Sequence, residues 1–293
     1  MYYIVYALFY LISLLPWRVL YWISDLAYAI IYYVVGYRKQ VVYNNLAIAF
    51  PEKTEAERKK IAKEFYHQFA DTFVEVIKLV SISGKELEKR VKTDTEILNQ
   101  LYAEGKNVQL LLGHFFNWEF ANVAYARKLM HRFLVVYKPI ENKAFNRLFL
   151  HIRSRFGTKL ISSSNFKKEF TQQAVPPYAL ILVGDQNPGK PDNSYWFSFF
   201  GKPAPFVKGP ELSARHNNTA VVFCSFYRVK RGYYDSKFYL YTTEPKSLPE
   251  ASITKAMIAF IEAEVKARPA NYLWSHRRWK WTFDPEKHGH LLK

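Results

Sequence analysis

The segment from Asn107 to Arg127 (NVQLLLGHFFNWEFANVAYAR) constrains the fold most, because it places the signals for a strand, a tight turn and a helix in direct succession. The apolar run Val108–Leu112 predicts a buried strand, and Gly113 predicts a turn because glycine adopts positive φ easily. The aromatic stretch that follows predicts a helix near 117–130. A strand, a turn and a helix in this order form the building unit of an α/β sheet.

The turn and the helix carry a histidine and a carboxylate, His114 and Glu119, five positions apart. Residues five apart in one continuous helix point roughly 140° away from each other. The two side chains therefore meet only if His114 lies in the turn and Glu119 in the first helical turns. In that arrangement the imidazole can act as a general base, the carboxylate can stabilise the imidazolium, and N–H groups at the helix start can face a developing oxyanion. The alternative interpretation is an ordinary loop histidine and a solvated glutamate.

Apolar runs and helical patterns alternate through the rest of the chain. The predicted elements are strands at 132–137, 178–183 and 220–226, and helices near 142–156 and 251–267. Such alternation predicts an α/β fold, in which sites form at the carboxyl ends of the strands. His114, Lys138 and Asp185 each fall just past a predicted strand.

Three segments outside this alternation also carry predictions. Thr54 begins a long predicted helix that reaches about Val80, because Thr54 and Glu57 have the spacing of a capping box and apolar residues then recur every three or four positions. The Gly- and Pro-broken segment Phe197–Pro210 predicts a loop that could cover an apolar channel. The last residues, Glu286–Lys293, predict a frayed end.

The composition indicates an acidic or membrane partner. The formal net charge is +17, and aromatic residues make up 18% of the chain. A charge of this size suits anionic lipid headgroups, an acidic carrier protein or nucleic acid. The segment Asn271–Trp281 interleaves aromatic and basic residues, which suits a membrane surface and also single-stranded nucleic acid. No H-E-x-x-H, paired C-x-x-C or G-x-S-x-G motif occurs, so the sequence predicts neither a metal site nor a nucleophile elbow.

The start of the chain is apolar and aromatic. Met1–Leu15 has no charged side chain but is shorter than the about 20 residues of a membrane span, and the next stretch, Val19–Tyr37, contains only Asp25. Two interpretations follow: an uncleaved anchor, tilted or half inserted, or a helical hairpin packed on the domain. The uncharged, tyrosine-rich start favours the membrane. We therefore expect a membrane-associated helical segment over 1–37 and a second domain over 38–293.

Seven motifs are spread from residue 38 to residue 280. They are RKQVVYNNLAIAFPE at 38–52, GHFFNWE at 113–119, VYKP at 136–139, HIRSRFG at 151–157, GDQNPG at 184–189, FFGKPA at 199–204 and YLWSHRRWK at 272–280. In this order and spacing they resemble the bacterial lipid A biosynthesis acyltransferases, the late lauroyl/myristoyl transferase family. That family is related more distantly to the glycerolipid and lysophospholipid acyltransferases.

The resemblance implies a fold and an activity. The fold would be a central mixed sheet flanked by helices, like that of the glycerolipid acyltransferases, with 38–293 as the acyltransferase domain. The protein would sit at the inner (cytoplasmic) membrane with its active site facing the cytoplasm. It would transfer an acyl chain from acyl-carrier protein to a hydroxyl of a lipid A precursor, with no cofactor beyond the phosphopantetheine that the donor carries. Nucleic acid would not be a partner.

The resemblance also assigns residues. The H-x-x-x-x-E motif falls on His114 and Glu119, as general base and its partner. The essential arginine of the helix after VYKP falls on Arg153, and the aspartate of the next strand-end loop falls on Asp185. Lys138, where the family often has arginine, and Asn117 complete the candidate substrate-binding residues.

Two other functions stay open from the sequence. The same fold could acylate a lysophospholipid or an aminolipid. Alternatively, the chain could be a non-enzymatic basic protein that binds membranes or nucleic acid, in which case surface Lys and Arg residues would matter and His114 would not.

Overall fold

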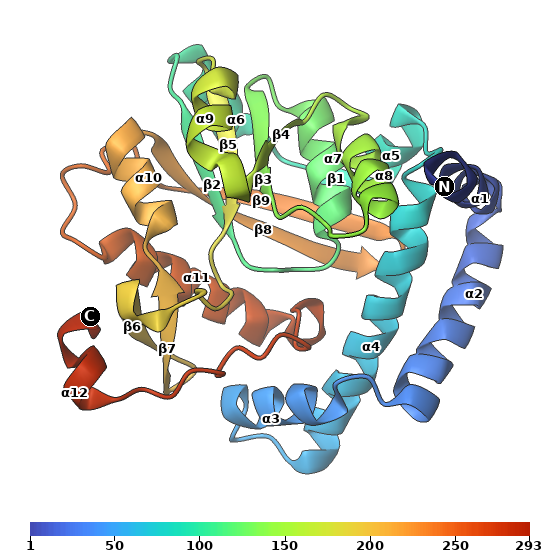
Figure 1. The fold of residues 1–293 in the computed structure, drawn as a ribbon, viewed down its shortest axis with the longest axis horizontal. Coiled ribbons are helices and arrows are strands. Elements are labelled where there is room, and N and C mark those ends of the chain that lie inside the picture. Colours follow the sequence, from blue (N-terminus) through green and yellow to red (C-terminus); the bar gives the residue numbers. More distant parts are fainter.

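The computed structural model describes residues 1–293 and has a seven-stranded mixed sheet at its centre (Figure 1). Its strands are β1 (Val91–Thr93), β2 (Val108–Leu112), β3 (Arg132–Tyr137), β4 (Lys159–Ser162), β5 (Tyr178–Val183), β8 (Ala220–Lys230) and β9 (Tyr233–Thr242). They lie in the order β1-β9-β8-β2-β5-β3-β4, and every neighbouring pair is parallel except the β8–β9 hairpin. The predicted α/β class with a mixed sheet and flanking helices is confirmed.

The four strands predicted from apolar runs are β2, β3, β5 and β8, and they form the continuous centre of the sheet. Central parallel strands are covered on both faces, so they appear in a sequence as unbroken apolar runs. The strands that the sequence did not indicate, β1, β4 and β9, lie outside them. β1 and β4 have only three and four residues, and the side chains of β9 alternate in burial, so a search for apolar runs does not detect these strands.

Helices connect and cover the strands. They are α1 (Tyr2–Leu14), α2 (Trp17–Ala29), the π-helical η1 (Ile30–Val35), α3 (Lys39–Ala49), α4 (Glu55–Lys78), α5 (Gly84–Arg90), α6 (Glu96–Ala103), α7 (Trp118–Lys128), α8 (Lys143–Ser154), α9 (Phe166–Gln173), α10 (Gly209–Asn217), α11 (Ser252–Ala267) and α12 (Pro285–His288). The predicted capping box of α4 is present: Thr54 Oγ1 accepts from the Glu57 N–H, and the Glu57 carboxylate accepts from the Thr54 N–H.

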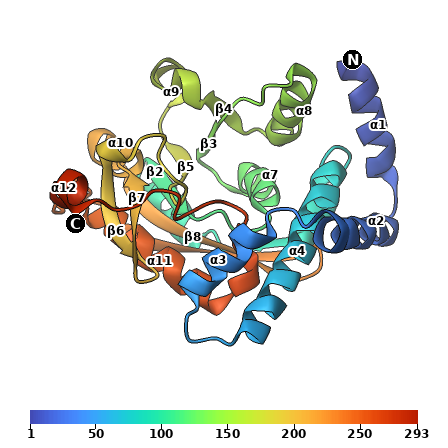
Figure 2. The same ribbon diagram turned by 60° about the horizontal axis from the view of Figure 1, so that its bottom comes forward.

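Two helices, α7 and α11, cover opposite faces of the sheet (Figure 2). Successive side chains of a strand point to opposite faces. On β8, Phe223 stacks on Phe260 of α11, whereas the next residue, Cys224, contacts Tyr125 of α7. The turn after β2 therefore emerges between two helical layers, which leaves its end of the sheet open for a site.

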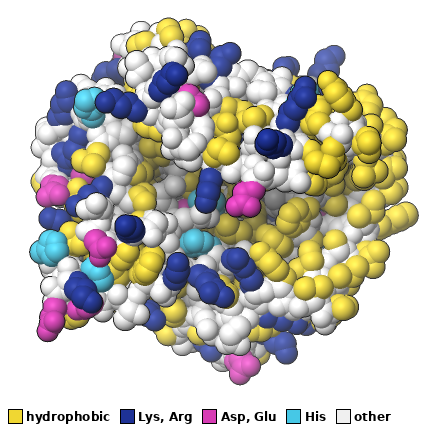
Figure 3. Space-filling model, in the orientation of Figure 1, with side chains coloured by type: hydrophobic (Ala, Val, Ile, Leu, Met, Phe, Trp, Pro, Cys, Tyr) yellow, Lys and Arg dark blue, Asp and Glu magenta, His cyan; other side chains and the backbone are white.

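The N-terminal helices lie at one edge of the molecule, where α2 packs along α4 and α1 packs against α8 and α4 (Figures 1 and 2). By length and composition, one helix, Trp17–Val35, could cross a membrane, and only 17% of its most apolar window is buried. Hydrophobic side chains cover this edge in Figure 3. The most exposed of them are Tyr3, Ile4, Leu8, Leu11, Leu14, Trp22, Leu26, Tyr33, Val34 and Val35.

The segment predicted as a loop over 197–210 is a hairpin instead, so that prediction was wrong. It comprises β6 (Ser194–Phe199) and β7 (Lys202–Val207), joined by Phe200 and Gly201, which both have positive φ. Such two-residue turns match the twist of an antiparallel pair. The prolines of β7 suggested a broken segment, but the hairpin tolerates them because β7 pairs with β6 on one side only.

The last residues are also ordered, which contradicts the predicted frayed end. Leu291 is 7% exposed, and the His288 ring stacks on the Trp196 indole at 4.7 Å between centroids. The Lys293 N–H donates to the Trp196 carbonyl at 3.0 Å. The C-terminus therefore covers the outer face of β6.

We expect Leu291→Ala to lower the free energy of unfolding by about 2–3 kcal/mol, because it leaves a cavity at a buried site. Leu292→Ala is the matched control, since Leu292 is 49% exposed, and it should change stability by less than about 0.5 kcal/mol. Denaturant unfolding in detergent measures both values. Equal, small effects for the two variants would restore the frayed-end interpretation.

Candidate active site

The register of two neighbouring strands brings His114 and Asp185 together. β2 and β5 pair in parallel, with Leu112 opposite Val183. Each strand is followed by one glycine and then by a polar residue, His114 after β2 and Asp185 after β5. His114 and Asp185 each lie two residues beyond a paired position on parallel strands, so they reach the same level along the strand direction. The two side chains therefore face each other at the carboxyl edge of the sheet.

His114 and Asp185 form two hydrogen bonds. The imidazole Nδ1 lies 2.5 Å from Asp185 Oδ1, and the His114 backbone N–H donates to Asp185 Oδ2 at 3.0 Å. Burial acts to raise the pKa of the Asp185 carboxyl, but the charge and hydrogen bonds of His114 and a hydrogen bond from Tyr272 outweigh it and lower the pKa to about 2. Asp185 is therefore a carboxylate at neutral pH, and His114 Nε2 has no hydrogen-bond partner in the protein.

The predicted pairing of His114 with Glu119 is not the one that forms. Glu119 lies in the first turn of α7, as expected, but its carboxylate accepts from Arg153, with Nη2 2.5 Å from Oε1 and Nε 2.9 Å from Oε2. Burial acts to lower the pKa of the Arg153 guanidinium, but the hydrogen bonds and charge of Glu119 raise it above its ordinary value. The site thus contains a hydrogen-bonded Asp185–His114 pair and a Glu119–Arg153 ion pair in place of one His–Glu dyad.

The start of α7 offers fewer free N–H groups than expected. Asn117 is the N-cap residue, and its Oδ1 accepts from the N–H groups of Glu119 and Phe120. Its Nδ2 donates to the buried Glu75 carboxylate at 3.0 Å. Asn117 is fully buried and does not line the adjacent pocket, and its hydrogen bonds shape the turn into α7.

The glycines at the two strand ends allow close packing, which is not the positive-φ role predicted for Gly113. Neither Gly113 nor Gly184 has a positive φ. A Cβ on Gly184 would lie 2.9 Å from the Met257 side chain of α11, and a Cβ on Gly113 would lie 3.1 Å from the Phe115 ring. The missing side chains therefore allow α11 and the turn to pack closely beneath the site.

A pocket of about 260 Å³ opens beside His114. Its polar lining residues include His114, Glu119, Lys138 and Arg153, and Lys138 is exposed just after β3. The other walls are mostly apolar: Leu112, Trp118, Ala121, Val135, Val136, Ile181 and Val183. In Figure 3 the face is hollowed near its middle, with Lys, Arg and His side chains around the hollow. An apolar pocket with a few cations and one imidazole suits an acyl chain attached to a polar group.

The C-terminal segment 271–281 holds the site from outside, a role that the sequence motif did not indicate. The Leu273 N–H donates to the His114 carbonyl at 3.1 Å, and the Phe116 N–H donates to the Asn271 carbonyl at 3.0 Å. Asn187, two residues after Asp185, receives a hydrogen bond from Arg278 and donates its own N–H to His276 Nε2. The segment therefore ties the His114 turn to the Asp185 loop.

Helix α3 anchors this segment in turn. Asn45 Nδ2 donates to the carbonyls of Trp274 at 2.8 Å and His276 at 2.7 Å, and Arg38 donates to the Ser275 carbonyl. Asn45 is buried, so its amide satisfies carbonyls that water does not reach. The motifs at 38–52, 184–189 and 272–280, which are far apart in the sequence, thus meet in one hydrogen-bond network around His114.

One group of possible metal ligands lies elsewhere. Asp25, His67 and Asp71 offer ligand atoms within 4.8 Å of one another. Arg231 bridges both carboxylates, with Nη2 2.5 Å from Asp25 Oδ1 and 2.6 Å from Asp71 Oδ1. Arg228 also pairs with Asp71, so two guanidinium groups balance these two acids, and the cluster is an ion-pair network that joins α2, α4 and the β8–β9 hairpin.

The comparisons with known proteins agree on one family. The family model described as "Bacterial lipid A biosynthesis acyltransferase" matches residues 1–281. Lipid A biosynthesis acyltransferase 2 of Shigella flexneri is 24% identical over 78% of this chain and 74% of the relative. The palmitoleoyltransferase of lipid A biosynthesis in Escherichia coli (strain K12) is 23% identical, over 83% and 79% of the two chains. The myristoyltransferase of the same organism is 24% identical, over 53% and 48%.

The low pKa of Asp185 predicts a pH dependence of stability. Because its folded pKa of about 2 lies below its ordinary value, the carboxylate stabilises the fold above about pH 4, and this contribution disappears as the pH falls toward 2. Over that range the free energy of unfolding should fall about 2 kcal/mol more for the wild type than for Asp185→Asn. Unfolding curves of both proteins in detergent provide the test, and parallel pH profiles would contradict the assignment.

Proposed function

Because the chain belongs to the bacterial lipid A biosynthesis acyltransferase family and is therefore an acyltransferase, we propose that it transfers a fatty acyl chain from acyl-carrier protein to a hydroxyl of a lipid A precursor. The observation that carries this proposal is the imidazole of His114, held by Asp185 through Nδ1 and free at Nε2, at the mouth of an apolar pocket. Hydroxyl groups require a base of this kind before they attack a thioester.

In the proposed mechanism Asp185 fixes the His114 ring with its proton on Nδ1. Nε2 then removes the proton of the acceptor hydroxyl while the hydroxyl oxygen attacks the thioester carbonyl carbon. A C–O bond forms, the C–S bond breaks, and the imidazolium returns the proton to the departing thiolate of the donor. Asp185 stabilises the imidazolium between the two transfers. No covalent enzyme intermediate is needed, because the base activates the acceptor directly.

Glu119 acts on Arg153 in this mechanism and not on the histidine. The carboxylate binds Nε and Nη2 of Arg153 and so fixes the plane of the guanidinium, while Nη1 has no partner in the protein. Arg153 and Lys138 both line the pocket and present positive charge beside His114. These two groups would bind phosphates of the acceptor or the phosphopantetheine phosphate of the donor.

The proposed membrane contact is the segment 1–37. The exposed apolar side chains of α1 and α2 would enter the lipid, which holds the pocket at the membrane surface where both the acceptor and the acyl chain are found. We propose the inner membrane, with the pocket facing the cytoplasm. The relatives are named for palmitoleoyl and myristoyl transfer, so the proposal does not include a chain length.

His114→Ala should lower kcat by about 10²–10⁴-fold, the usual contribution of a general base, while the circular dichroism and melting temperature stay near those of the wild type. Asp185→Asn should lower kcat as well, because the asparagine amide no longer holds the proton of the neutral His114 ring on Nδ1. His216→Ala, at an exposed histidine, is the control and should keep full activity. Radiolabelled acyl transfer measures the three rates. A fully active His114→Ala enzyme would refute the mechanism.

The acceptor is tested separately with the same donor. Acyl-carrier protein loaded with a fatty acid is incubated with a lipid A precursor, a lysophospholipid or an aminolipid. We expect product from the lipid A precursor, at a rate at least tenfold above those from the other two. Turnover with only the lysophospholipid or the aminolipid would keep the enzyme class and reject the acceptor.

The net charge of +17 predicts a salt effect on the encounter with the donor. Acyl-carrier proteins are acidic, and salt at about 0.1 M already screens charges beyond about 10 Å. At subsaturating donor, the rate should fall several-fold between about 50 and 300 mM NaCl, while kcat at saturating donor changes little. A rate at subsaturating donor that does not depend on salt would argue against electrostatic steering.

A further inference from the structure

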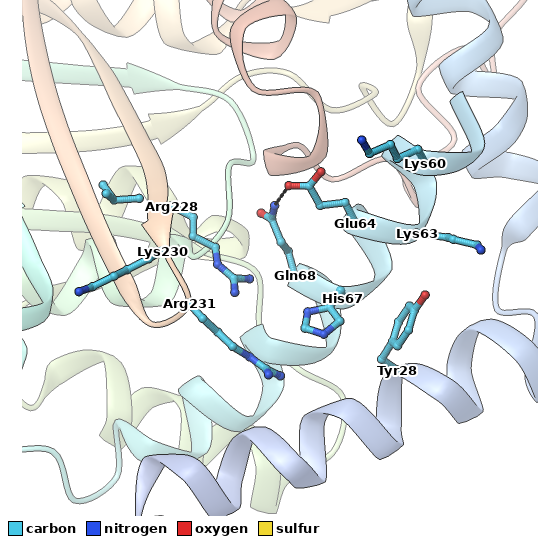
Figure 4. Close-up of a pocket in the computed structure, with 10 residues that line it drawn as sticks. Tyr28, Lys60, Lys63, Glu64, His67, Gln68, Arg228, Lys230 and Arg231 are labelled. Atoms are coloured by element: carbon cyan, nitrogen blue, oxygen red, sulfur yellow. Dashed lines mark hydrogen bonds between the residues drawn. The ribbon is translucent and has the colours of Figure 1, made fainter. Parts of the chain in front are cut away.

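A second pocket, of about 540 Å³, lies between α2, α4 and the β8–β9 turn (Figure 4). Its lining residues come from these three elements and are mostly basic or polar: Tyr28, Lys60, Lys63, Glu64, His67, Gln68, Arg228, Val229, Lys230 and Arg231. It shares no lining residue with the pocket beside His114, and the proposed acyl-transfer mechanism does not involve it.

The pocket and the acyl-transfer site lie on opposite faces of α4. Lys60, Lys63 and His67 follow the three- and four-residue spacing of one helix face, and all three line the second pocket. Phe65 and Phe69 lie about half a turn away and pack on Phe116 in the His114 turn, at 5.6 and 6.3 Å between ring centroids. Helix α4 therefore separates the two sites.

The charge of the pocket is strongly positive. Lys and Arg supply five of its ten lining residues, and Glu64 is the one acid among them. Lys60, Lys63 and Lys230 form no ion pair and stand at the rim in Figure 4. Arg228, whose side chain is 15% exposed, uses only Nη1, which donates to Asp71 at 2.9 Å. Its other N–H groups are available to a ligand.

Arg231 has a different role, because its donors are already occupied by Asp25, Asp71 and the Tyr21 carbonyl. This network fixes the floor of the pocket, and Arg231 and Arg228 together balance the charges of Asp25 and Asp71. The positive charge of the three rim lysines, Lys60, Lys63 and Lys230, is thus left over and exceeds the single negative charge of Glu64, which is the arrangement of an anion site rather than of a cation site.

Gln68 is an independent observation. The residue is 8% exposed and lines the pocket, and its Oε1 is buried with no hydrogen-bond partner. Its Nε2 has only a long contact with Glu64 Oε1, at 3.4 Å. Buried amide groups rarely stay unpaired in folded proteins. A ligand that carries both phosphate oxygens and hydroxyl groups would satisfy this amide and the cations together.

The position of α2 indicates where such a ligand would come from. Tyr28 turns toward the pocket in Figure 4. Trp22 and Leu26 of the same helix are exposed, and the helical spacing places them on a different face from Tyr28. A helix that buries this apolar face in a bilayer holds the pocket beside the headgroups. We propose that the pocket binds the phosphate of an anionic membrane phospholipid, at a second site separate from the one for acyl transfer.

The test uses the full chain in a non-ionic detergent and follows its melting temperature at constant ionic strength. Short-chain phosphatidylglycerol at about ten times its dissociation constant should raise the melting temperature by about 2–4 °C, and phosphatidylcholine of the same chain length should not. Lys60→Gln/Lys230→Gln should lose most of this shift. Lys246→Gln/Lys255→Gln removes the same charge from exposed lysines elsewhere and should keep it.

Arg228→Gln is the second variant and should also lose the shift, while Asp71 keeps its contacts with Arg231. Inorganic phosphate is tested in parallel: an equal shift would support the site but assign it to a soluble phosphate compound. No shift with either ligand, or a full shift in Lys60→Gln/Lys230→Gln, would overturn the proposal. Acyl transfer measured without phosphatidylglycerol should be unchanged in Lys60→Gln/Lys230→Gln. The lipid-binding result therefore does not depend on whether the proposed acyl transfer is correct.

Discussion

The parallel register of β2 with β5 is the constraint on which the site depends. Backbone hydrogen bonds fix Leu112 opposite Val183, and the residues two positions further, His114 and Asp185, then meet without any adjustable loop between them. A slip of one residue would turn every side chain of one strand to the opposite face. The geometry of the base is therefore set by two paired strands at the centre of the sheet, in keeping with the general need for reactive groups to be held on regular elements.

Three surrounding layers preserve this geometry. Below, α11 packs closely against the strand ends because Gly113 and Gly184 have no side chain. Outside, the segment 271–281 bonds to the backbone of the His114 turn and to Asn187. Beside it, Asn117 and Glu75 fix the entry into α7. Hydrogen bonds outside the pocket thus connect motifs that lie far apart in the sequence.

Much of the fold could be predicted from the sequence, because its central strands are buried on both faces and appear as apolar runs. The sheet edges and the β6–β7 hairpin could not, since their alternating, tyrosine- and proline-containing sequences resemble loops.

The site was predicted in part. The residues His114, Asp185, Glu119, Arg153 and Lys138 do gather around one pocket or directly behind it. The pairing of His114 with Asp185 was missed because residue spacing within one segment shows only which residues are near each other in the chain. This pairing depends on the register between β2 and β5, which no single segment of the sequence reveals. The repeated ending, an apolar run followed by Gly and a polar residue in both VQLLLGH and ALILVGD, was the available signal.

The most direct measurement is the tautomer of His114, observed by nuclear magnetic resonance of ¹⁵N-histidine-labelled protein and assigned by comparison with His114→Ala. If Asp185 orients the ring, the neutral imidazole carries its proton on Nδ1 in the wild type and in Glu119→Gln, and loses this preference in Asp185→Asn. A proton on Nε2 in the wild type, or a preference that Glu119→Gln abolishes and Asp185→Asn leaves intact, would contradict the pairing of His114 with Asp185.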